Sequence, residues 1–307
     1  MFLGVLNVKR IIVAEEFDYI ERQRRIEALC REYPFLKKTN IGKSSMGKYI
    51  NALKIGSSES YSLITAAFHG SERITSNILL MFIEELCIAI KKDSYIAGFK
   101  ARKALSGRGV IFVPCVNPDG CDISLLGEKA LGNNASHFKK MFGNNFKKWN
   151  ANYRGVDINH NFNADWENLR RKERALGIYG PSPTRFGGPK PESEPETVAL
   201  TTLCRAANIR HATALHSQGE VIYWKYGNTE HPKSRKMAEI MATSSHYALD
   251  MPIGISDGGG FKDWFIEEFH RPAFTVELGK GENPLPIESA DCIYKQVKEM
   301  LMLCSIM

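Results

Sequence analysis

The segment Leu63-Ile64-Thr65-Ala66-Ala67-Phe68-His69-Gly70-Ser71-Glu72 decides what this chain can be. Its first five residues form an apolar, partly β-branched run that predicts a buried strand, and a helix-like segment follows from Ile74. His69 and Glu72 therefore lie three positions apart where a strand meets a helix. An imidazole and a carboxylate held in this way can bind one metal ion from one side.

Two further residues complete a candidate metal site. A catalytic zinc ion takes three protein ligands and leaves a fourth position open for water. His216, at the end of a strand-like run, is the third candidate ligand. Glu277 lies within another apolar run, where a carboxylate is rarely buried unless it is paired. Each feature alone is common in proteins without a metal, and a lone histidine at a strand end usually belongs to the core or the surface. Their order and setting together favour a metal site.

Strand-like and helix-like segments alternate along the chain. We expect strands at 50–55, 62–68, 109–114, 212–215, 221–225 and 272–278, and helices at 15–31, 77–90, 234–247 and 288–303. This alternation is typical of an α/β fold with a mixed, largely parallel central β-sheet and helices on both faces. We expect a single domain over residues 1–307, with residues 1–14 as a poorly ordered N-terminal extension. In such sheets, sites lie at the carboxyl ends of strands.

Several connecting segments carry signals of their own. Residues 41–48 predict a turn between two strands, and Asn117-Pro118-Asp119-Gly120 has the composition of a turn. We expect two long excursions from the core, at residues 125–152 and 167–192, and the first of them is expected to be partly helical. Ser193-Glu194-Pro195-Glu196 predicts a helix start, with the serine as N-cap and Glu196 closing a capping box.

The composition fits a globular protein without membrane segments. Of the 307 residues, 43% are hydrophobic and 24% are charged, and nothing approaches a membrane-spanning apolar stretch. The N-terminus has no charged region before its apolar stretch and no small-residue cleavage site, so we expect a cytoplasmic protein, with secretion or release by lysis left open. The seven cysteines are odd in number and scattered, which indicates free thiols in a reducing compartment.

The net charge of +7 is attributed mainly to a solvated basic surface. Basic residues cluster at 139–140, 147–148 and 170–172, but no aromatic-interleaved nucleic-acid motif accompanies them. We therefore expect neither a nucleic-acid partner nor a membrane partner. An anionic peptide substrate, such as a cell-wall peptide, suits this charge better.

Taken in order, the motifs resemble those of the zinc carboxypeptidase family, from about Asp18 to the last helix. The matching segments are Ile41-Gly42-Lys43-Ser44, His69-Gly70-Ser71-Glu72, Asn117-Pro118-Asp119-Gly120, Gly155-Val156-Asp157-Ile158-Asn159-His160-Asn161-Phe162, Ser193-Glu194-Pro195-Glu196-Thr197, His216-Ser217, Asp263-Trp264 and Thr275-Val276-Glu277-Leu278. Within the family, residues 216–224 and 279–284 look most like the bacterial γ-D-glutamyl-meso-diaminopimelate peptidases, which cut peptidoglycan stem peptides.

The resemblance implies a role for each matching residue. His69, Glu72 and His216 would hold one Zn²⁺ per chain. Asp157 would orient His69, because ligating imidazoles usually donate their other N–H to a carboxylate or a carbonyl. Glu277 would be the general base that takes a proton from the activated water and delivers it to the leaving amine. Zinc is inferred from the ligand types, so another divalent ion in the cell stays open.

Departures from the family pattern bear on how the substrate is held. The family usually has Asn-Arg where this chain has Asn159 and His160. That arginine grips the terminal carboxylate of the substrate as a two-pronged fork, which a histidine cannot reproduce. The family's oxyanion arginine aligns near Asn150, which leaves Arg154 or Lys148 as candidates to replace it.

A further departure concerns the side chain that the substrate presents. Lys262 stands where the family sets this specificity, just before Asp263 and Trp264. A lysine there suits an acidic group, such as the extra carboxylate of diaminopimelate; the alternative is a solvated loop lysine. The mobile tyrosine of digestive family members falls near Ile255 or Ser256 and is absent.

Together these features favour a zinc peptidase that hydrolyses the γ-D-glutamyl-diamino acid bond of peptidoglycan stem peptides. Three alternatives stay open: a general metallocarboxypeptidase acting on L-peptides, a catalytically inactive peptide-binding protein on the same fold, and an amidase for non-peptide acyl-amino acids. His160 and the absent tyrosine oppose the first, and the complete ligand set opposes the second. Endo or exo cleavage, stem-peptide length, diaminopimelate or lysine preference and oligomeric state are undetermined.

Overall fold

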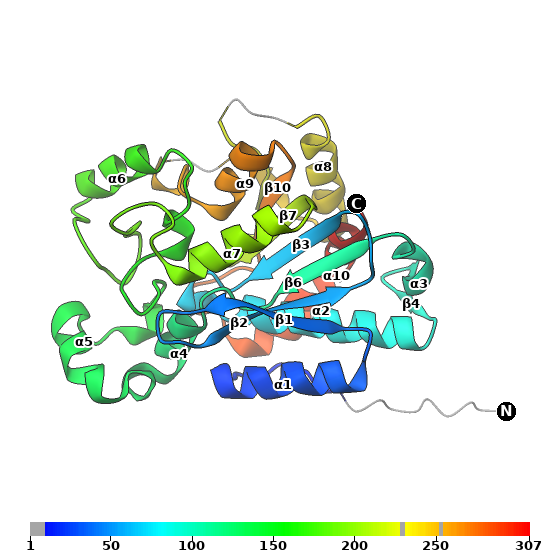
Figure 1. Ribbon diagram of the computed structural model, residues 1–307, viewed down its shortest axis with the longest axis horizontal. Helices are drawn as coiled ribbons and strands as arrows, with labels where there is room; N and C mark the ends of the chain where they lie inside the picture. The colour runs from blue at the N-terminus through cyan, green and yellow to red at the C-terminus, as the bar shows by residue number, and fades with distance from the viewer. Residues whose placement is uncertain (1–9, 228–230, 252–253) are drawn as a thin grey trace.

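An eight-stranded mixed sheet forms the centre of the computed structural model, which describes residues 10–227, 231–251 and 254–307 (Figure 1). The strands are β1 Lys37–Lys43, β2 Tyr49–Ile55, β3 Tyr61–Ala66, β6 Gly109–Val113, β7 Ile209–His216, β8 Val221–Tyr223, β9 Ala248–Asp250 and β10 Ala273–Glu277. Their order across the sheet is β1-β2-β6-β3-β7-β10-β8-β9. A separate ribbon pairs β4 Tyr95–Ile96 with β5 Phe99–Lys100.

The middle of the sheet is parallel. Strands β6, β3, β7 and β10 run in the same direction, and antiparallel pairings add β2 and β1 on one side and β8 on the other. β1 is an outer strand, and its register with β2 shifts between Asn40 and Gly42. The predicted mixed, largely parallel sheet is confirmed.

Helices cover both faces of the sheet, as predicted: α7 lies on one face and α2 and α10 lie on the other (Figure 1). The helices are α1 Tyr19–Glu32, α2 Ile74–Lys91, α3 Ala101–Ala104, α4 Pro118–Leu126, α5 Ala135–Phe142, α6 Trp166–Ala175, α7 Pro195–Ala206, α8 Ser234–Ser245, α9 Phe261–Phe269 and α10 Ala290–Ile306. Parallel strands need such crossover connections, which explains why helices and strands alternate.

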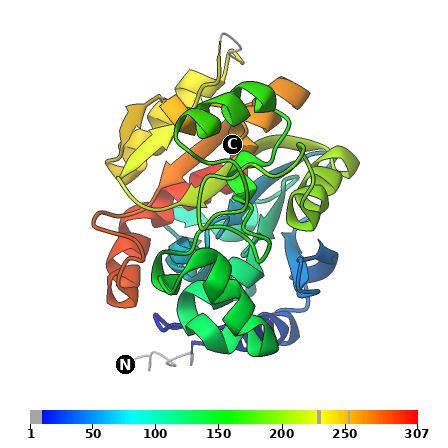
Figure 2. The same cartoon turned by 90° about the vertical axis from the view of Figure 1, so that its left-hand side faces the viewer.

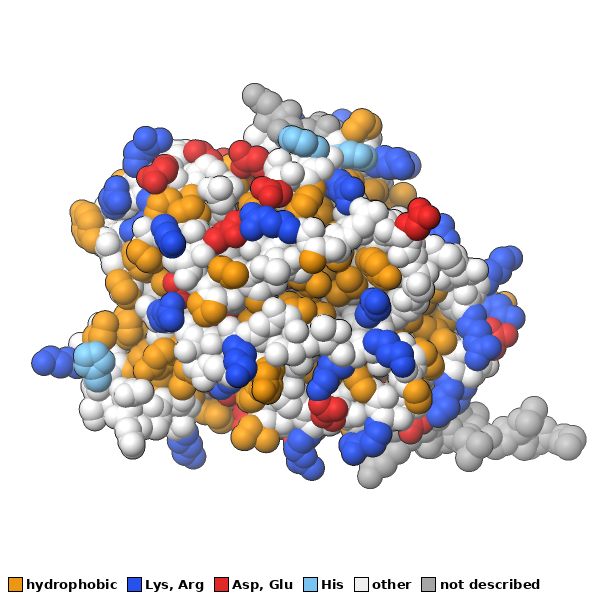
Figure 3. Space-filling view, viewed as in Figure 1, with side chains coloured by type: hydrophobic (Ala, Val, Ile, Leu, Met, Phe, Trp, Pro, Cys, Tyr) orange, Lys and Arg blue, Asp and Glu red, His pale blue; other side chains and the backbone are white. Residues whose placement is uncertain are grey.

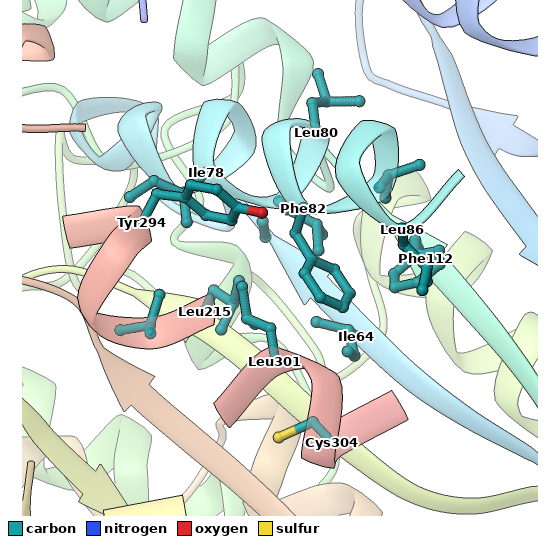
Figure 4. Close-up of a cluster of buried hydrophobic side chains, with 14 of the residues drawn as sticks. Ile64, Ile78, Leu80, Phe82, Leu86, Phe112, Leu215, Tyr294, Leu301 and Cys304 are labelled. Atoms are coloured by element: carbon teal, nitrogen blue, oxygen red, sulfur yellow. The ribbon is translucent and has the colours of Figure 1, made fainter. Parts of the chain in front are cut away.

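Apolar side chains fill the space between the sheet and each helical layer. On one face, α1, α2, α8 and α10 share a core that includes Phe82, Leu215 and Leu301 (Figure 4). On the other face, α7 and α9 pack through residues such as Phe261 and Trp264. Burial of this apolar surface is the main force that holds the layers together.

The two excursions lie beside the core, at the left of Figure 1 and facing the viewer in Figure 2. The first contains α5 and short 3-10 turns, so its predicted partial helicity is confirmed. It has a small apolar cluster of its own around Phe138 and Trp149. The second excursion begins with α6, which the sequence interpretation did not identify as a helix.

One predicted turn begins later than expected. β1 continues to Lys43, and the turn starts at Ser44, whose N–H donates to the carbonyl of Lys48 at 2.8 Å. Gly42 suggested a turn but lies in the strand. Glycine is needed there because a Cβ would stand 2.5 Å from the Cβ of Ala199 in α7. This glycine allows the close approach of a helix to the sheet.

The predicted turn at 117–120 is instead the start of α4. The side chain of Asn117 accepts the N–H of Gly120 at 2.9 Å and so caps the helix, and Pro118 occupies its first turn. Asparagine and proline favour both turns and helix starts, so their composition alone could not separate the two.

The predicted capping box at Ser193 is wrong. The N-cap of α7 is Glu194, and no side chain caps the helix. Glu196 does not reach back to Ser193, because it accepts the backbone N–H and the hydroxyl of Ser45, at 2.8 and 2.9 Å. A long-range contact thus replaces the local one.

The expected N-terminal extension falls only partly within the described residues, since residues 1–9 lie outside them. The backbone N–H groups of Ile11 and Ile12 donate to the carboxylate of Glu84 at 2.7 and 3.0 Å, and Ile12 is buried. The chain is therefore anchored to α2 from this point on.

The surface carries charges of both signs. On the face shown in Figure 3, lysine and arginine side chains are spread out with acidic side chains among them. Within the described ranges, the structure contains no helix long and apolar enough to cross a membrane.

We expect Leu301→Ala to lower the free energy of unfolding by about 2–5 kcal/mol, because Leu301 is fully buried and its truncation leaves a cavity. Urea denaturation followed by circular dichroism measures the change. Ile20→Ala is the matched control: this side chain is 67% exposed, so its loss should change stability by less than about 0.5 kcal/mol. Equal effects of both variants would contradict the assignment of this core.

Burial lowers the pKa of His211 from 6.5 to about 4, although its Nε2 contacts the carbonyl of Cys304 at 2.8 Å. Between these two pH values the unfolded chain binds the extra proton, so this residue should reduce stability by up to about 3 kcal/mol as the pH falls from 6.5 to 4. Urea midpoints across this range, compared with those of His211→Gln, measure the contribution. The same acid slope in both proteins would exclude it.

Candidate metal centre

Neighbouring strand ends bring the predicted ligands together. β3 ends just before His69, which precedes a single 3-10 turn, Gly70–Glu72. β7, the next strand in the sheet, ends at His216. Glu277 ends β10 and lies opposite His216 in the parallel register. The topology therefore gathers, at one edge of the sheet, residues that are far apart in the sequence.

A glycine lets the loop that carries His69 and Glu72 pack tightly. A Cβ on Gly70 would stand 2.3 Å from the carbonyl oxygen of Gly120 and 2.5 Å from that of Trp149. The Gly70 N–H also donates to the carbonyl of Asn150 at 3.0 Å. Any side chain at this position would displace the loop that carries His69 and Glu72.

The carboxylate of Glu72 lies between two imidazoles. His69 Nδ1 is 2.8 Å from Oε1 of Glu72, and His216 Nδ1 is 3.0 Å from Oε2. One potential ligand atom from each residue lies within 4.8 Å of the others. Glu72 and His216 are buried, and His69 is nearly so. Two nitrogens and one oxygen converging on one point are a donor set that zinc favours.

Asp157 completes the surroundings of His69. Its Oδ1 lies 3.0 Å from His69 Nε2, and its Oδ2 accepts the N–H of Arg185 at 2.8 Å. Burial opposes a charged imidazole, but Glu72 and Asp157 together raise the pKa of His69 well above its usual value. A carboxylate at each nitrogen favours either the imidazolium form of the ring or the binding of a cation through one nitrogen. The residues therefore fit a metal ion at Nδ1, with Asp157 fixing the other nitrogen.

Glu277 faces the same space without being part of the ligand cluster. It lines a pocket of about 160 Å³ together with His69 and His216. Burial, followed by the charge of Glu72, raises the pKa of Glu277 well above the usual value for a carboxyl group. A divalent cation nearby would favour the ionised form, in which Glu277 can accept a proton.

Asn159 and His160 also line this pocket. Asn159 Oδ1 accepts the N–H of Phe261 at 3.0 Å, so its amide nitrogen is the group left to donate. His160 Nδ1 lies 2.9 Å from Oε1 of Glu173 and 3.0 Å from the carbonyl of Arg185. Because both neighbours are acceptors, Nδ1 carries the proton and Nε2 is the nitrogen available to a ligand. Burial lowers the pKa of His160.

Lys262 lines the pocket as well but is not a free charge. Its ammonium group is paired with the adjacent carboxylate of Asp263 and donates to the carbonyl of Lys225 at 2.9 Å. It also lies 5.6 Å from the ring centre of Tyr226. The ammonium group has three N–H donors, and these contacts among the described residues use two of them.

The structure does not bring Arg154 or Lys148 into the pocket lining. Half of the Arg154 side chain is exposed, and its guanidinium lies 3.8 Å from Glu194. Lys148 is exposed and paired with Glu282. Asn150, where the family arginine aligns, accepts the hydroxyl of Ser71 through its side chain.

Sequence reasoning missed two residues of this region. Tyr223 on β8 lines the pocket. Its partner in the β8–β10 register is Thr275, which lies two residues before Glu277 in β10. Alternate residues of a strand point to the same face of the sheet, so the β8–β10 register would have placed Tyr223 on the same face as Glu277. Glu173, fully buried in α6, holds His160 and the N–H of Gly187. No sequence signal could have identified it.

Comparisons with known proteins identify the family and the fold. The sequence model of the zinc carboxypeptidase family matches residues 23–302. The chain is 37% identical to γ-D-glutamyl-L-diamino acid endopeptidase 1 of Lysinibacillus sphaericus, over 92% of this chain and 70% of the relative. It is 27% identical to murein peptide amidase A of Escherichia coli K12, over 50% of this chain and 51% of the relative. Bovine thrombin-activatable fibrinolysis inhibitor has the same fold, with a TM-score of 0.73 at 19% identity, over 95% of this chain and 97% of that one.

We expect His216→Ala to lose stoichiometric zinc, because it removes one of three converging ligands. Asp157→Ala should bind zinc about 10- to 100-fold more weakly, because it frees the ring of His69. Competition with a chromophoric chelator measures both affinities. Glu277→Gln is the control and should bind zinc as the wild-type protein does. Wild-type affinity in His216→Ala would contradict the assigned ligands.

Proposed function

The chain belongs to the zinc carboxypeptidase family, and from this premise we propose that it hydrolyses the γ-D-glutamyl-diamino acid bond of peptidoglycan stem peptides. The observation that carries the proposal is the convergence of His69, Glu72 and His216 at a pocket that also contains Glu277. The similarity to a γ-D-glutamyl-L-diamino acid endopeptidase over nearly the whole chain supports the choice of bond.

The two histidines and Glu72 would hold one zinc ion, with Asp157 keeping His69 in place. A zinc ion at this position would polarise the scissile carbonyl and make the attacking water more acidic. Within the pocket, Glu277 accepts the proton of that water and passes it to the departing amine. Its place opposite His216 in the sheet register supports this role, because a metal held by His216 would lie close to Glu277.

The pocket favours a substrate group that carries both charges. Lys262 offers one remaining N–H, while its neighbour Asp263 already compensates the positive charge. An isolated carboxylate would therefore meet a nearly neutral pair. The far end of meso-diaminopimelate bears an ammonium group and a carboxylate on one carbon, and such a zwitterion matches an adjacent cation and anion.

His160 argues against tight capture of a free terminal carboxylate. Two acceptors occupy its Nδ1 side, so only Nε2 can contact the substrate. A single nitrogen cannot form the two parallel hydrogen bonds of an arginine fork. This difference supports an enzyme that tolerates further residues after the diamino acid.

Mass spectrometry of products tests the function. The zinc-loaded protein is given L-Ala-γ-D-Glu-meso-diaminopimelate, with and without D-Ala, and separately a plain L-peptide with a free C-terminus. We expect release of L-Ala-D-Glu with the L-peptide left intact. Trimming of the L-peptide alone would replace the proposal with a general carboxypeptidase, and no cleavage despite bound zinc would favour a binding protein.

We expect Glu277→Gln to lower kcat by about 10²- to 10⁴-fold, because the amide cannot accept the proton of the attacking water. The rate of product formation at saturating substrate measures the loss of kcat. The zinc content of the same preparation must equal that of the wild-type protein, which separates loss of the base from loss of metal. Near-normal turnover would refute the assigned base.

We expect Lys262→Met to reduce kcat/KM for the diaminopimelate substrate about 10- to 100-fold more than for the lysine analogue, which lacks the extra carboxylate. Lys262→Arg, which keeps a cation beside Asp263, is the matched control. Thermal melting of both variants shows whether the fold is intact. Equal losses on the two substrates would remove Lys262 from the specificity argument.

A further inference from the structure

Two buried thiols lie directly behind the metal-binding loop. Cys115 follows β6 and Cys121 lies in α4, and their sulfur atoms are 3.7 Å apart. Both side chains are buried, and with Ala67 they form a small cluster of their own. The seven cysteines are all free thiols. Peptide hydrolysis as described above uses neither of these two sulfurs.

Arg22 places a positive charge beside this pair. Its side chain enters from α1 and is buried, and neither Nε nor Nη1 has a hydrogen-bond partner within the described residues. Burial opposes ionisation of Cys115, but the contact with Cys121 and the charge of Arg22 lower its pKa overall. The same contact raises the pKa of Cys121. A thiol with a lowered pKa beside a second thiol is the arrangement of a reactive dithiol.

The space around the pair limits which oxidant can reach it. A cavity of about 10 Å³ is lined by Arg22 and Cys115, with Pro114 and Pro118 among its other walls. This volume holds about one water molecule. Hydrogen peroxide is close to that size, whereas glutathione disulfide is many times larger.

We propose that Cys115 and Cys121 form a peroxide-sensitive dithiol whose oxidation loosens the metal-binding loop. The Cys115 thiolate attacks one oxygen of hydrogen peroxide and the O–O bond breaks. Hydroxide departs, and Cys115 becomes a sulfenic acid. Cys121 then attacks the sulfur of Cys115, the S–O bond breaks, and water leaves with the proton of Cys121. In total, two thiols and one peroxide give one disulfide and two water molecules.

Hydrogen bonds tie this segment to the loop. The Asn117 N–H donates to the carbonyl of Ala67 at 2.9 Å, and its side-chain amide donates to the carbonyl of Phe68 at 3.0 Å. A disulfide needs a sulfur–sulfur distance of about 2.05 Å, so the two sulfurs must approach by about 1.6 Å from 3.7 Å. Asn117 lies between the two cysteines in the chain, so the shift reaches the residues that precede His69.

The test uses the reduced, zinc-loaded full chain. After graded exposure to hydrogen peroxide, free thiols are alkylated and peptides are analysed by mass spectrometry. Zinc release to a chromophoric chelator is followed in parallel. We expect a peptide linking Cys115 to Cys121, zinc release at least tenfold faster, and reversal of both by dithiothreitol. Glutathione disulfide at the same concentration should react at least tenfold more slowly.

Variants separate the steps. Cys121→Ser should stop at a sulfenic acid on Cys115, which dimedone traps once the protein is unfolded in urea, and should release zinc at the rate of the reduced protein. Arg22→Gln should slow disulfide formation at least tenfold. Cys292→Ser changes an exposed thiol and should behave as the wild-type protein does. Because Arg22 is buried, circular dichroism must first show that its variant is folded; the wild-type measurement decides the proposal without it.

Two outcomes would overturn the proposal. The first is that the thiols of Cys115 and Cys121 can still be alkylated after exposure to peroxide concentrations that oxidise the exposed Cys292. The second is a disulfide between them with unchanged zinc release, which would remove the link to the metal loop. Both measurements are independent of the substrate, so they stand or fall separately from the proposed peptidase activity.

Discussion

The site depends on one carboxylate that two imidazoles share. Glu72 contacts His69 through one oxygen and His216 through the other, at 2.8 and 3.0 Å. The Ser217 N–H also donates to it, at 3.1 Å. Such a buried negative charge is costly unless positive or hydrogen-bonding groups surround it. The parallel pairing of β3 with β7 places these groups around it, and the proposed metal binding follows from the same arrangement.

Support for this carboxylate comes from behind the loop as well as from its neighbours. Gly70 and Gly120 allow two backbone segments to approach closely, and Asn117 links the loop to the segment after β6. Asp157, from a distant turn, fixes the far nitrogen of His69. Positions that contact no substrate therefore set the geometry of those that would. The proposed effect of thiol oxidation on metal binding rests on this arrangement.

Much of this could be predicted from the sequence. Apolar strands followed by helices indicated the sheet class, and short motifs such as His69-Gly70-Ser71-Glu72 pointed to candidate ligands, which the structure brings together. Local signals failed where a distant partner decides the outcome. Glu196, for example, bonds to Ser45 instead of closing a cap. Glu173 could not be found at all, because its role depends on the packing of α6 against His160.

The outer strand β1 has features that oppose the pairing of its free edge with another chain. An open sheet edge offers unpaired backbone groups to another chain, which is a route to aggregation. Here the register shifts between Asn40 and Gly42, and the exposed lysines Lys37 and Lys43 add positive charge to the strand. A second copy approaching in the same way would meet like charges and an irregular ladder. This edge is therefore a poor template for fibril growth.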